Sequence, residues 1–148
     1  MSTFGQVVTA LKARAAVQIT LMPVRWDRDQ PPQLPDVPSP FVFFRLEMDR
    51  ARFIEAGGGR GSNRQRTDGE LWGLVFMPRE AGLEAEATYG EHVAAAFRSY
   101  RDAYVSCGPV TPAPAVPGSD LMPPGMDSEV GNYSCIVAAV PLYFDQTG

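Results

Sequence analysis

The residues with the greatest chemical potential in this sequence are one histidine and two cysteines. His92 is the only histidine, and Cys107 and Cys135 are the only cysteines. A Cys–His nucleophile or a zinc site needs partner residues at short, recognisable spacings, and none accompanies these three. His92 lies mid-helix between acidic and apolar neighbours, and both cysteines lie in apolar segments. The pattern therefore favours a half-exposed helical histidine and two buried free thiols.

A glycine-rich segment, Gly57–Gly61, is a second candidate, because such loops can bind phosphate groups. No Lys-Ser or Lys-Thr follows it, and no G-x-G-x-x-G opens a helix after a buried strand. It is therefore typical of a flexible hairpin tip. Asp68 and Glu70 flank a turn-like Gly69 and are predicted to be solvated surface residues, not an acid–base pair. The sequence thus predicts no catalytic, cofactor or metal site, and a protein that is not an enzyme.

Three arginines beside the glycine-rich segment, Arg60, Arg64 and Arg66, form a local basic cluster. They fit either a solvated hairpin end or an interface patch that meets acidic residues of a neighbouring subunit. Nucleic-acid binding is the weakest interpretation, because no aromatic residues are interleaved with these arginines. The net charge of −4 also argues against tight binding of duplex nucleic acid.

The elements that must position these residues can be predicted from hydrophobic periodicity. We expect helices over 4–19 and 81–104, and strands over 41–48, 52–56, 64–78, around Val110, and over 132–144. Thr3 and Gln6 predict a capping box for the first helix. The predicted buried face of that helix consists of Phe4, Val8, Leu11, Ala15 and Ile19. That of the second helix consists of Leu83, Ala87, Gly90, Ala94, Phe97 and Tyr104.

The strand over 64–78 is apolar on both faces in its second half, which predicts a central position in the sheet. In the last strand, Pro141 lacks an N–H and is expected at an edge or bulge. Two long segments, 23–40 and 111–131, are rich in proline and are predicted to be loops, with Trp26 covering the core. The order of elements implies one α+β domain over 1–148. We expect a mostly antiparallel mixed β-sheet with two α-helices packed on one face.

The chain contains no apolar run of the ~20 residues that span a bilayer. Its N-terminal segment, with Lys12 and Arg14 inside an amphipathic pattern, does not resemble a secretory signal. We therefore expect no membrane partner and synthesis in the cytoplasm.

The layout resembles that of the tail terminator, or tail completion, proteins of long-tailed phages, including lambda-type terminators and prophage and gene-transfer-agent relatives. The resemblance covers nearly the whole chain. In chain order, an N-terminal helix is followed by Val24-Arg25-Trp26 and Pro31-Pro32, then by an aromatic strand over 41–46 and a glycine-bearing hairpin. The next strand begins with Arg66-Thr67-Asp68-Gly69 and ends with Phe76-Met77-Pro78. A Gly82-led helix, a short strand at Gly108 and a closing strand with the sequence Val-Pro-Leu-Tyr-Phe complete the resemblance. The segment 112–131 is longer and richer in proline than in that family.

The resemblance implies a structural virion protein at the tail neck, assembled in a host bacterial cytoplasm. It implies a homo-hexameric ring that caps the tail tube protein and then meets the head–tail connector or stopper protein. Six copies would carry a charge of about −24, so DNA could pass without specific binding. The predicted contacts between subunits or with the tube are Arg60, Arg64, Arg66, Leu121, Met122 and Met126.

Three other functions fit the sequence less well. A head–tail connector or stopper ring shares the size, acidity and α+β character of a terminator. A tail tube subunit would polymerise into long stacked tubes. A small ligand-binding domain or enzyme would be monomeric, with a pocket of convergent polar groups.

Overall fold

The computed structural model describes residues 2–29, 37–55, 63–115 and 132–147. The described helices are α1 (Phe4–Gln18), the 3-10 helix η1 (Arg79–Ala81) and α2 (Leu83–Phe97). The described strands are β1 (Val24–Trp26), β2 (Phe41–Met48), β3 (Arg52–Glu55), β4 (Arg64–Pro78), β5 (Ser106–Cys107), β6 (Pro112–Ala115) and β7 (Tyr133–Thr147). Neither long helix has the length and apolar character needed to cross a membrane.

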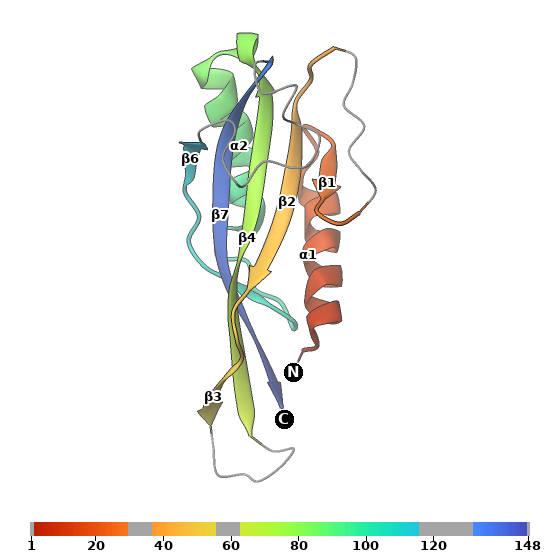
Figure 1. Cartoon of the computed structure of the whole chain (residues 1–148), viewed down its shortest axis with the longest axis vertical. Helices are drawn as coiled ribbons and strands as arrows, with labels where there is room; N and C mark the ends of the chain where they lie inside the picture. The colour runs from red at the N-terminus through yellow and green to blue at the C-terminus, as the bar shows by residue number, and fades with distance from the viewer. Residues whose placement is uncertain (1, 30–36, 56–62, 116–131, 148) are drawn as a thin grey trace.

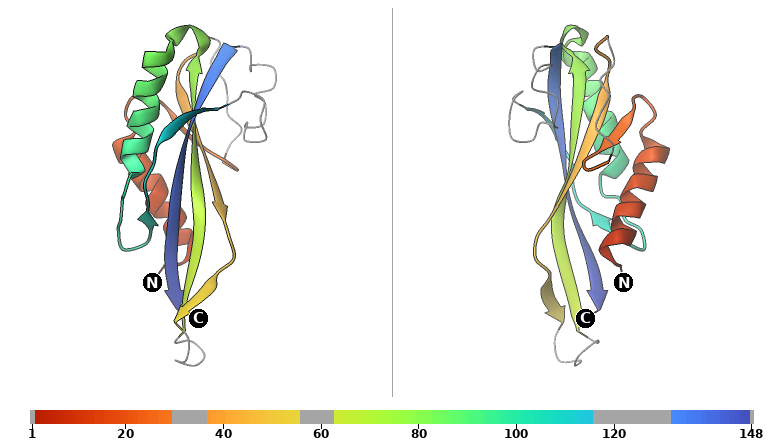
Figure 2. Two further views of the ribbon diagram at one scale, coloured as in Figure 1. Left: turned by 90° about the vertical axis from the view of Figure 1, so that its left-hand side faces the viewer. Right: turned by 45° about the vertical axis from the view of Figure 1, so that its right-hand side comes forward.

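The described strands form one sheet in the order β1-β2-β4-β7-β5, with β3 beside β4 and β6 beside β7. The pairing of β1 with β2 is parallel, and the other strand pairs are antiparallel. Both helices lie on the same side of this sheet (Figures 1 and 2). The predicted α+β class, with a mostly antiparallel mixed sheet, is therefore confirmed.

The main core lies between the sheet and the helices. Val7 and Leu11 of α1 and Val93 and Phe97 of α2 are fully buried in it. Phe44 of β2 stacks on Trp26 with 4.7 Å between ring centroids and meets the Phe97 ring edge-on at 5.6 Å. Trp26 therefore covers the core, as predicted.

The opposite face of the sheet is also apolar over the upper part of β2, β4 and β7. Phe41 stacks on Phe76 at 5.0 Å and contacts Tyr133 edge-on at 5.6 Å, and all three side chains are buried. Burial on both faces explains why this half of β4 lacks alternation of polar and apolar residues. The predicted central position of β4 is confirmed, since it lies between β2 and β7.

Helix α1 begins as predicted. Thr3 accepts a hydrogen bond from the backbone N–H of Gln6, and the Gln6 side chain accepts one from the N–H of Thr3. Its predicted buried face is partly wrong, because Phe4 is 52% exposed while Val7 takes its place in the core. The helix packs over the sheet through a narrower stripe than the sequence pattern indicates.

Helix α2 ends earlier than predicted, at Phe97 and not at Tyr104. Ser99 adopts a left-handed conformation with φ 54°, and its N–H donates to the carbonyl of Gly108 instead of continuing the helix. Asp102 then accepts hydrogen bonds from the N–H groups of Tyr104 and Val105, which stabilises a turn. The predicted buried face was wrong at three positions, since these side chains are exposed: Leu83, Ala87 and Tyr104.

Two short strands replace the single one expected around Val110, which lies between β5 and β6 and is buried. The segment 23–40, expected to be loop only, contains β1. Gly69, expected in a turn, lies within β4 opposite Met48. An added Cβ at Gly69 would lie 2.5 Å from the carbonyl oxygen of Glu47, so the close approach of β2 to β4 requires glycine there.

Pro141 lies in β7, an interior strand between β4 on one side and β5 and β6 on the other. Its carbonyl accepts a hydrogen bond from the N–H of Gly108 at 2.7 Å. In an antiparallel strand the nitrogen and the carbonyl of one residue point to the same side. The nitrogen of Pro141 therefore points away from β4, towards the gap between β5 and β6, and interrupts no hydrogen bond with the central strand. The predicted position at an edge or bulge was therefore wrong, because β7 is an interior strand with continuous pairing to β4. Pro141 is tolerated there because its nitrogen faces this gap.

Candidate interface site at the end of the sheet

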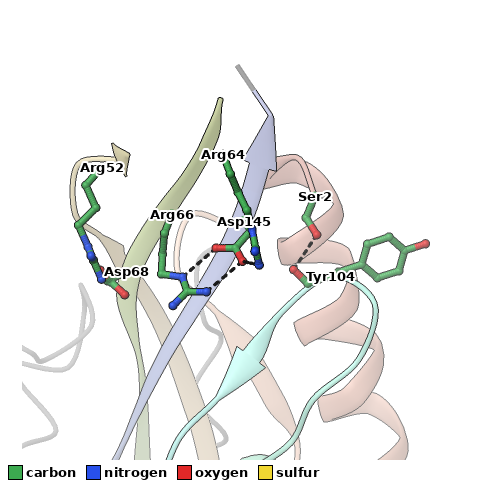
Figure 3. A network of polar contacts seen from close by, with 7 residues as sticks. All are labelled: Ser2, Arg52, Arg64, Arg66, Asp68, Tyr104 and Asp145. Carbon is green, nitrogen blue, oxygen red and sulfur yellow. Dashed lines mark hydrogen bonds and ion pairs between the residues drawn. The ribbon is translucent and has the colours of Figure 1, made fainter. Parts of the chain in front are cut away.

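A polar network of two arginines and one carboxylate lies where β4 and β7 extend past α1. Arg66 of β4 and Asp145 of β7 are cross-strand partners, so their side chains share one face of the sheet. Arg66 donates to the Asp145 carboxylate from Nε at 2.8 Å and from Nη2 at 3.0 Å. Arg64, two residues along the same face, donates to it from Nη2 at 2.7 Å (Figure 3). One carboxylate therefore holds two guanidinium groups.

The electrostatics of this triad (Arg64, Arg66 and Asp145) favour its charged form. The two hydrogen bonds from Arg66, and then the one from Arg64, lower the pKa of Asp145 to about 2, although partial burial opposes the shift. The same hydrogen bond raises the pKa of Arg66. The Arg66 guanidinium also lies 3.9 Å from the centre of the Tyr143 ring. The two arginines are thus held in place before any partner arrives.

The N-terminal end of the chain is attached beside the triad. The backbone N–H of Ser2 donates to the carbonyl of Asp145 at 2.8 Å. The Ser2 hydroxyl donates to the carbonyl of Tyr104 at 2.7 Å (Figure 3). Ser2 is buried although it is polar. Through these bonds, the turn after α2 and the start of α1 are tied to the end of β7.

The triad borders a polar hollow of about 340 Å³, which Arg101 also lines. Arg64 and Arg66 together carry one positive charge more than Asp145 neutralises. Arginine in a fixed orientation suits recognition of carboxylates, because its planar fork presents paired donors. The geometry is therefore suited to binding an acidic group of another molecule.

A second charged feature, the acidic band, lies on the same sheet face nearer the core. Glu47 of β2 and Glu70 of β4 are direct cross-strand partners, and Asp68 follows two residues from Glu70. Asp49 lies beside Asp68, to whose carbonyl its N–H donates at 2.8 Å. These four carboxylates line one hollow of about 680 Å³, which Arg101 also lines, and Asp68 pairs with Arg52 at 3.0 Å. Like charges directly opposite each other destabilise a sheet, so this arrangement has a stability cost.

His92 and the two cysteines do not form a common centre. His92 is half-buried, and its Nε2 accepts a hydrogen bond from the backbone N–H of Thr20 at 3.1 Å. Cys107 and Cys135 are free and buried, as predicted. Burial raises the pKa of each thiol to about 12, so both are protonated and poorly nucleophilic at neutral pH. Across the described ranges, no cluster of His, Cys, Asp and Glu could hold a metal ion.

The structure brings together two of the six predicted contact residues, Arg64 and Arg66. The carboxylate that it places beside them belongs to the same chain. The other four lie outside the described residues: Arg60, Leu121, Met122 and Met126. Sequence reasoning missed Asp145, because the last strand was predicted to end at Phe144. The structure extends that strand to Thr147 and places Asp145 opposite Arg66. The polar run Asp145-Gln146-Thr147 shows no alternation that would have predicted this extension.

No protein-family model matches the chain, and no curated protein matches it.

Proposed function

We propose that this chain is a tail terminator of a long-tailed phage or related particle. It would form a hexameric ring at the tail neck, cap the head-proximal end of the tail tube and provide the surface that the head connector or stopper binds. In this proposal it is a structural virion protein that needs no cofactor and catalyses no reaction.

The observation that carries the proposal is the acidic band. Glu47 and Glu70 are opposed on the sheet face that points away from the helices, next to Asp49 and Asp68. A chain under selection for stability alone would avoid this pairing. On the wall of a channel, the same carboxylates repel the phosphates of DNA and let it pass without binding.

The shape of the sheet supports the same function. Strands β4 and β7 pair continuously from Pro78↔Tyr133 to Arg64↔Thr147, well beyond the part that the helices cover (Figures 1 and 2). The end of these two strands that lies away from the helices carries the triad of Arg64, Arg66 and Asp145. A projecting, charged sheet end is suited to contact a neighbouring ring along the tail axis, and electrostatic matching there would select the correct partner.

The proposal is tested by adding the purified chain to growing tail tubes built from the tube protein of the same particle. We expect tubes to stop elongating and electron micrographs to place the chain at one end of each tube. Decoration of a separate connector ring, with tube growth unaffected, would instead identify a connector or stopper. Incorporation along the whole tube would identify a tube subunit.

A further inference from the structure

The two flanks of the molecule differ in charge. The first, flank A, comprises residues 4–29, with α1, β1 and the turn after β1. The second, flank B, comprises residues 79–98, with η1 and α2. Sheet order places β1 at one edge and β5 and β6 at the other, and Figure 1 shows α1 and β1 on one side of the molecule and α2 and β6 on the other.

Flank A is basic and flank B is acidic. Flank A has four basic side chains and two carboxylates, a net charge of +2: Lys12, Arg14, Arg25, Arg28, Asp27 and Asp29. Flank B has four carboxylates and two arginines, a net charge of −2 with His92 neutral: Glu80, Glu84, Glu86, Glu91, Arg79 and Arg98. The two flanks therefore carry equal and opposite net charges.

Internal contacts use part of this charge, including that of Arg14, whose guanidinium donates to the carbonyl of Ala96 in α2 at 2.8 Å. They leave Arg28 exposed on flank A, and Arg79, Glu80 and Glu84 exposed on flank B. On flank A, Lys12 pairs with Asp29 at 3.0 Å. On flank B, Glu91 pairs with Arg98 through two hydrogen bonds. Among the described residues, neither the Arg28 nor the Glu84 side chain makes a hydrogen bond or ion pair, and both are exposed. Arg28 and Glu84 thus remain available to a partner.

The conformation of Arg28 is a second sign of function. Its φ is 68°, in the left-handed region that glycine or asparagine adopts more easily. The turn after β1 therefore holds a guanidinium where an uncharged residue would fit with less strain. Residues in strained backbone conformations are often found at functional sites, where the contact that the side chain makes offsets the strain.

The outer edge of β6 is poorly suited to pair with a strand of a neighbouring subunit. In β7, every second residue directs its N–H and C=O groups to the same side of the strand, and the carbonyl of Pro141 points towards β5 and β6. Val137 and Cys135 therefore direct their backbone groups towards β6, where they pair with Ala113 and Ala115. Pro112 and Pro114 therefore direct their nitrogens outward, where they offer no hydrogen-bond donor. A neighbour on this side must be bound through side chains.

We infer that flank A of one copy docks against flank B of the next copy, with Arg28 facing the acidic start of α2 around Glu84. The inference rests on the proposed ring and names the contact that closes it. Contacts in a closed ring are heterologous, so each subunit needs two different, complementary surfaces on opposite sides. Exposed apolar side chains accompany the charges, with Leu21 on flank A 48% exposed and Leu83 on flank B 71% exposed.

Charge reversal on each flank tests this inference. Either change reduces the net charge of the altered flank to zero. In Arg28→Glu, the introduced glutamate faces Glu84 at every interface; in Glu84→Arg, the introduced arginine faces Arg28 at every interface. We expect each variant alone to associate roughly tenfold more weakly per interface than the wild type. Arg50→Glu, an exposed change of the same charge between β2 and β3, serves as the control and should leave assembly unchanged.

Mixing the two variants gives the sharpest result. The glutamate introduced at position 28 of one variant then faces the arginine introduced at position 84 of the other. At the alternate interfaces, the unaltered Arg28 and Glu84 face each other. Native mass spectrometry should therefore show restored rings with equal numbers of the two variants. Variants that assemble like the wild type, or a mixture that fails to recover, would overturn the flank contact. A wild-type chain that stays monomeric at high micromolar concentration would overturn the ring itself.

Discussion

The two halves of the β4–β7 pair use the same backbone pairing for different purposes. In the upper half, from Leu71 to Met77, the side chains on both faces are mostly buried and apolar. In the lower half, from Arg64 to Glu70, one face carries the acidic band and the triad of Arg64, Arg66 and Asp145. Hydrogen bonding continues unbroken through both halves. What changes is the environment of the side chains, so the upper half supplies stability and the lower half offers a charged surface.

The largest effect is expected from the upper half. Phe44→Ala removes a fully buried ring that contacts Trp26 and Phe97. We expect the free energy of unfolding to fall by about 3–5 kcal/mol, measured by urea denaturation. Phe4→Ala, at an exposed phenylalanine, is the control and should cost much less. Equal losses in the two variants would contradict the assigned core.

The junction between the halves is expected to be sensitive to a single methyl group. In Gly69→Ala, the new Cβ would lie 2.4 Å from the Met48 sulfur and 2.5 Å from the Glu47 carbonyl oxygen. Because one of these atoms is backbone, β2 and β4 must shift, and we expect a loss of about 2–3 kcal/mol. In Gly5→Ala the nearest atom is 4.0 Å away, and stability should not fall. If Gly69→Ala were as stable as the wild type in thermal unfolding, the strand register would be in error.

A pH-dependent effect is expected from the lower half. Because the pKa of Asp145 is lowered from 3.8 to about 2, its contribution is fully present above pH ~4 and is lost as the pH falls towards 2. We expect Asp145→Asn to cost about 2 kcal/mol at neutral pH. Acid titration followed by circular dichroism should show that the variant lacks this component of the wild-type acid sensitivity. An identical acid transition in both proteins would contradict the triad.

The smallest effect is expected at the edge strand β3. Arg52 pairs with Asp68 at 3.0 Å, but the two side chains are 60% and 43% exposed. Solvent screens such a pair, so Arg52→Ala should cost no more than about 0.5 kcal/mol. Arg66→Ala should cost more, because that side chain is only 25% exposed and also packs on Tyr143. Chemical denaturation of both variants side by side checks this ranking.

The same comparison explains what the sequence could predict. The apolar first half of β2 and the two-faced apolar run of β4 follow from burial on both faces of the sheet, so the bounds of these strands and the central place of β4 could be predicted. The end of α2 could not, because it depends on the left-handed conformation of Ser99, whose N–H donates to the carbonyl of Gly108 in the following turn region. β1 was missed because three residues are too few to show a period.

For the site, sequence reasoning found the arginines but not their carboxylate. Clustering along the chain is visible in a sequence, and this identified Arg64 and Arg66. The pairing of Arg66 with Asp145 joins residues 79 positions apart and depends on strand register, which the sequence alone does not fix. The acidic band was missed for the same reason, since Glu47 and Glu70 become neighbours only through the pairing of β2 with β4.

The proposed ring is tested most directly by electron microscopy of the purified wild-type chain. We predict closed six-membered rings around an open channel, with the sheet face that bears Glu47 and Glu70 turned inward and the helices outside. Single molecules with no ring, or rings in which the helices line the channel, would contradict this prediction.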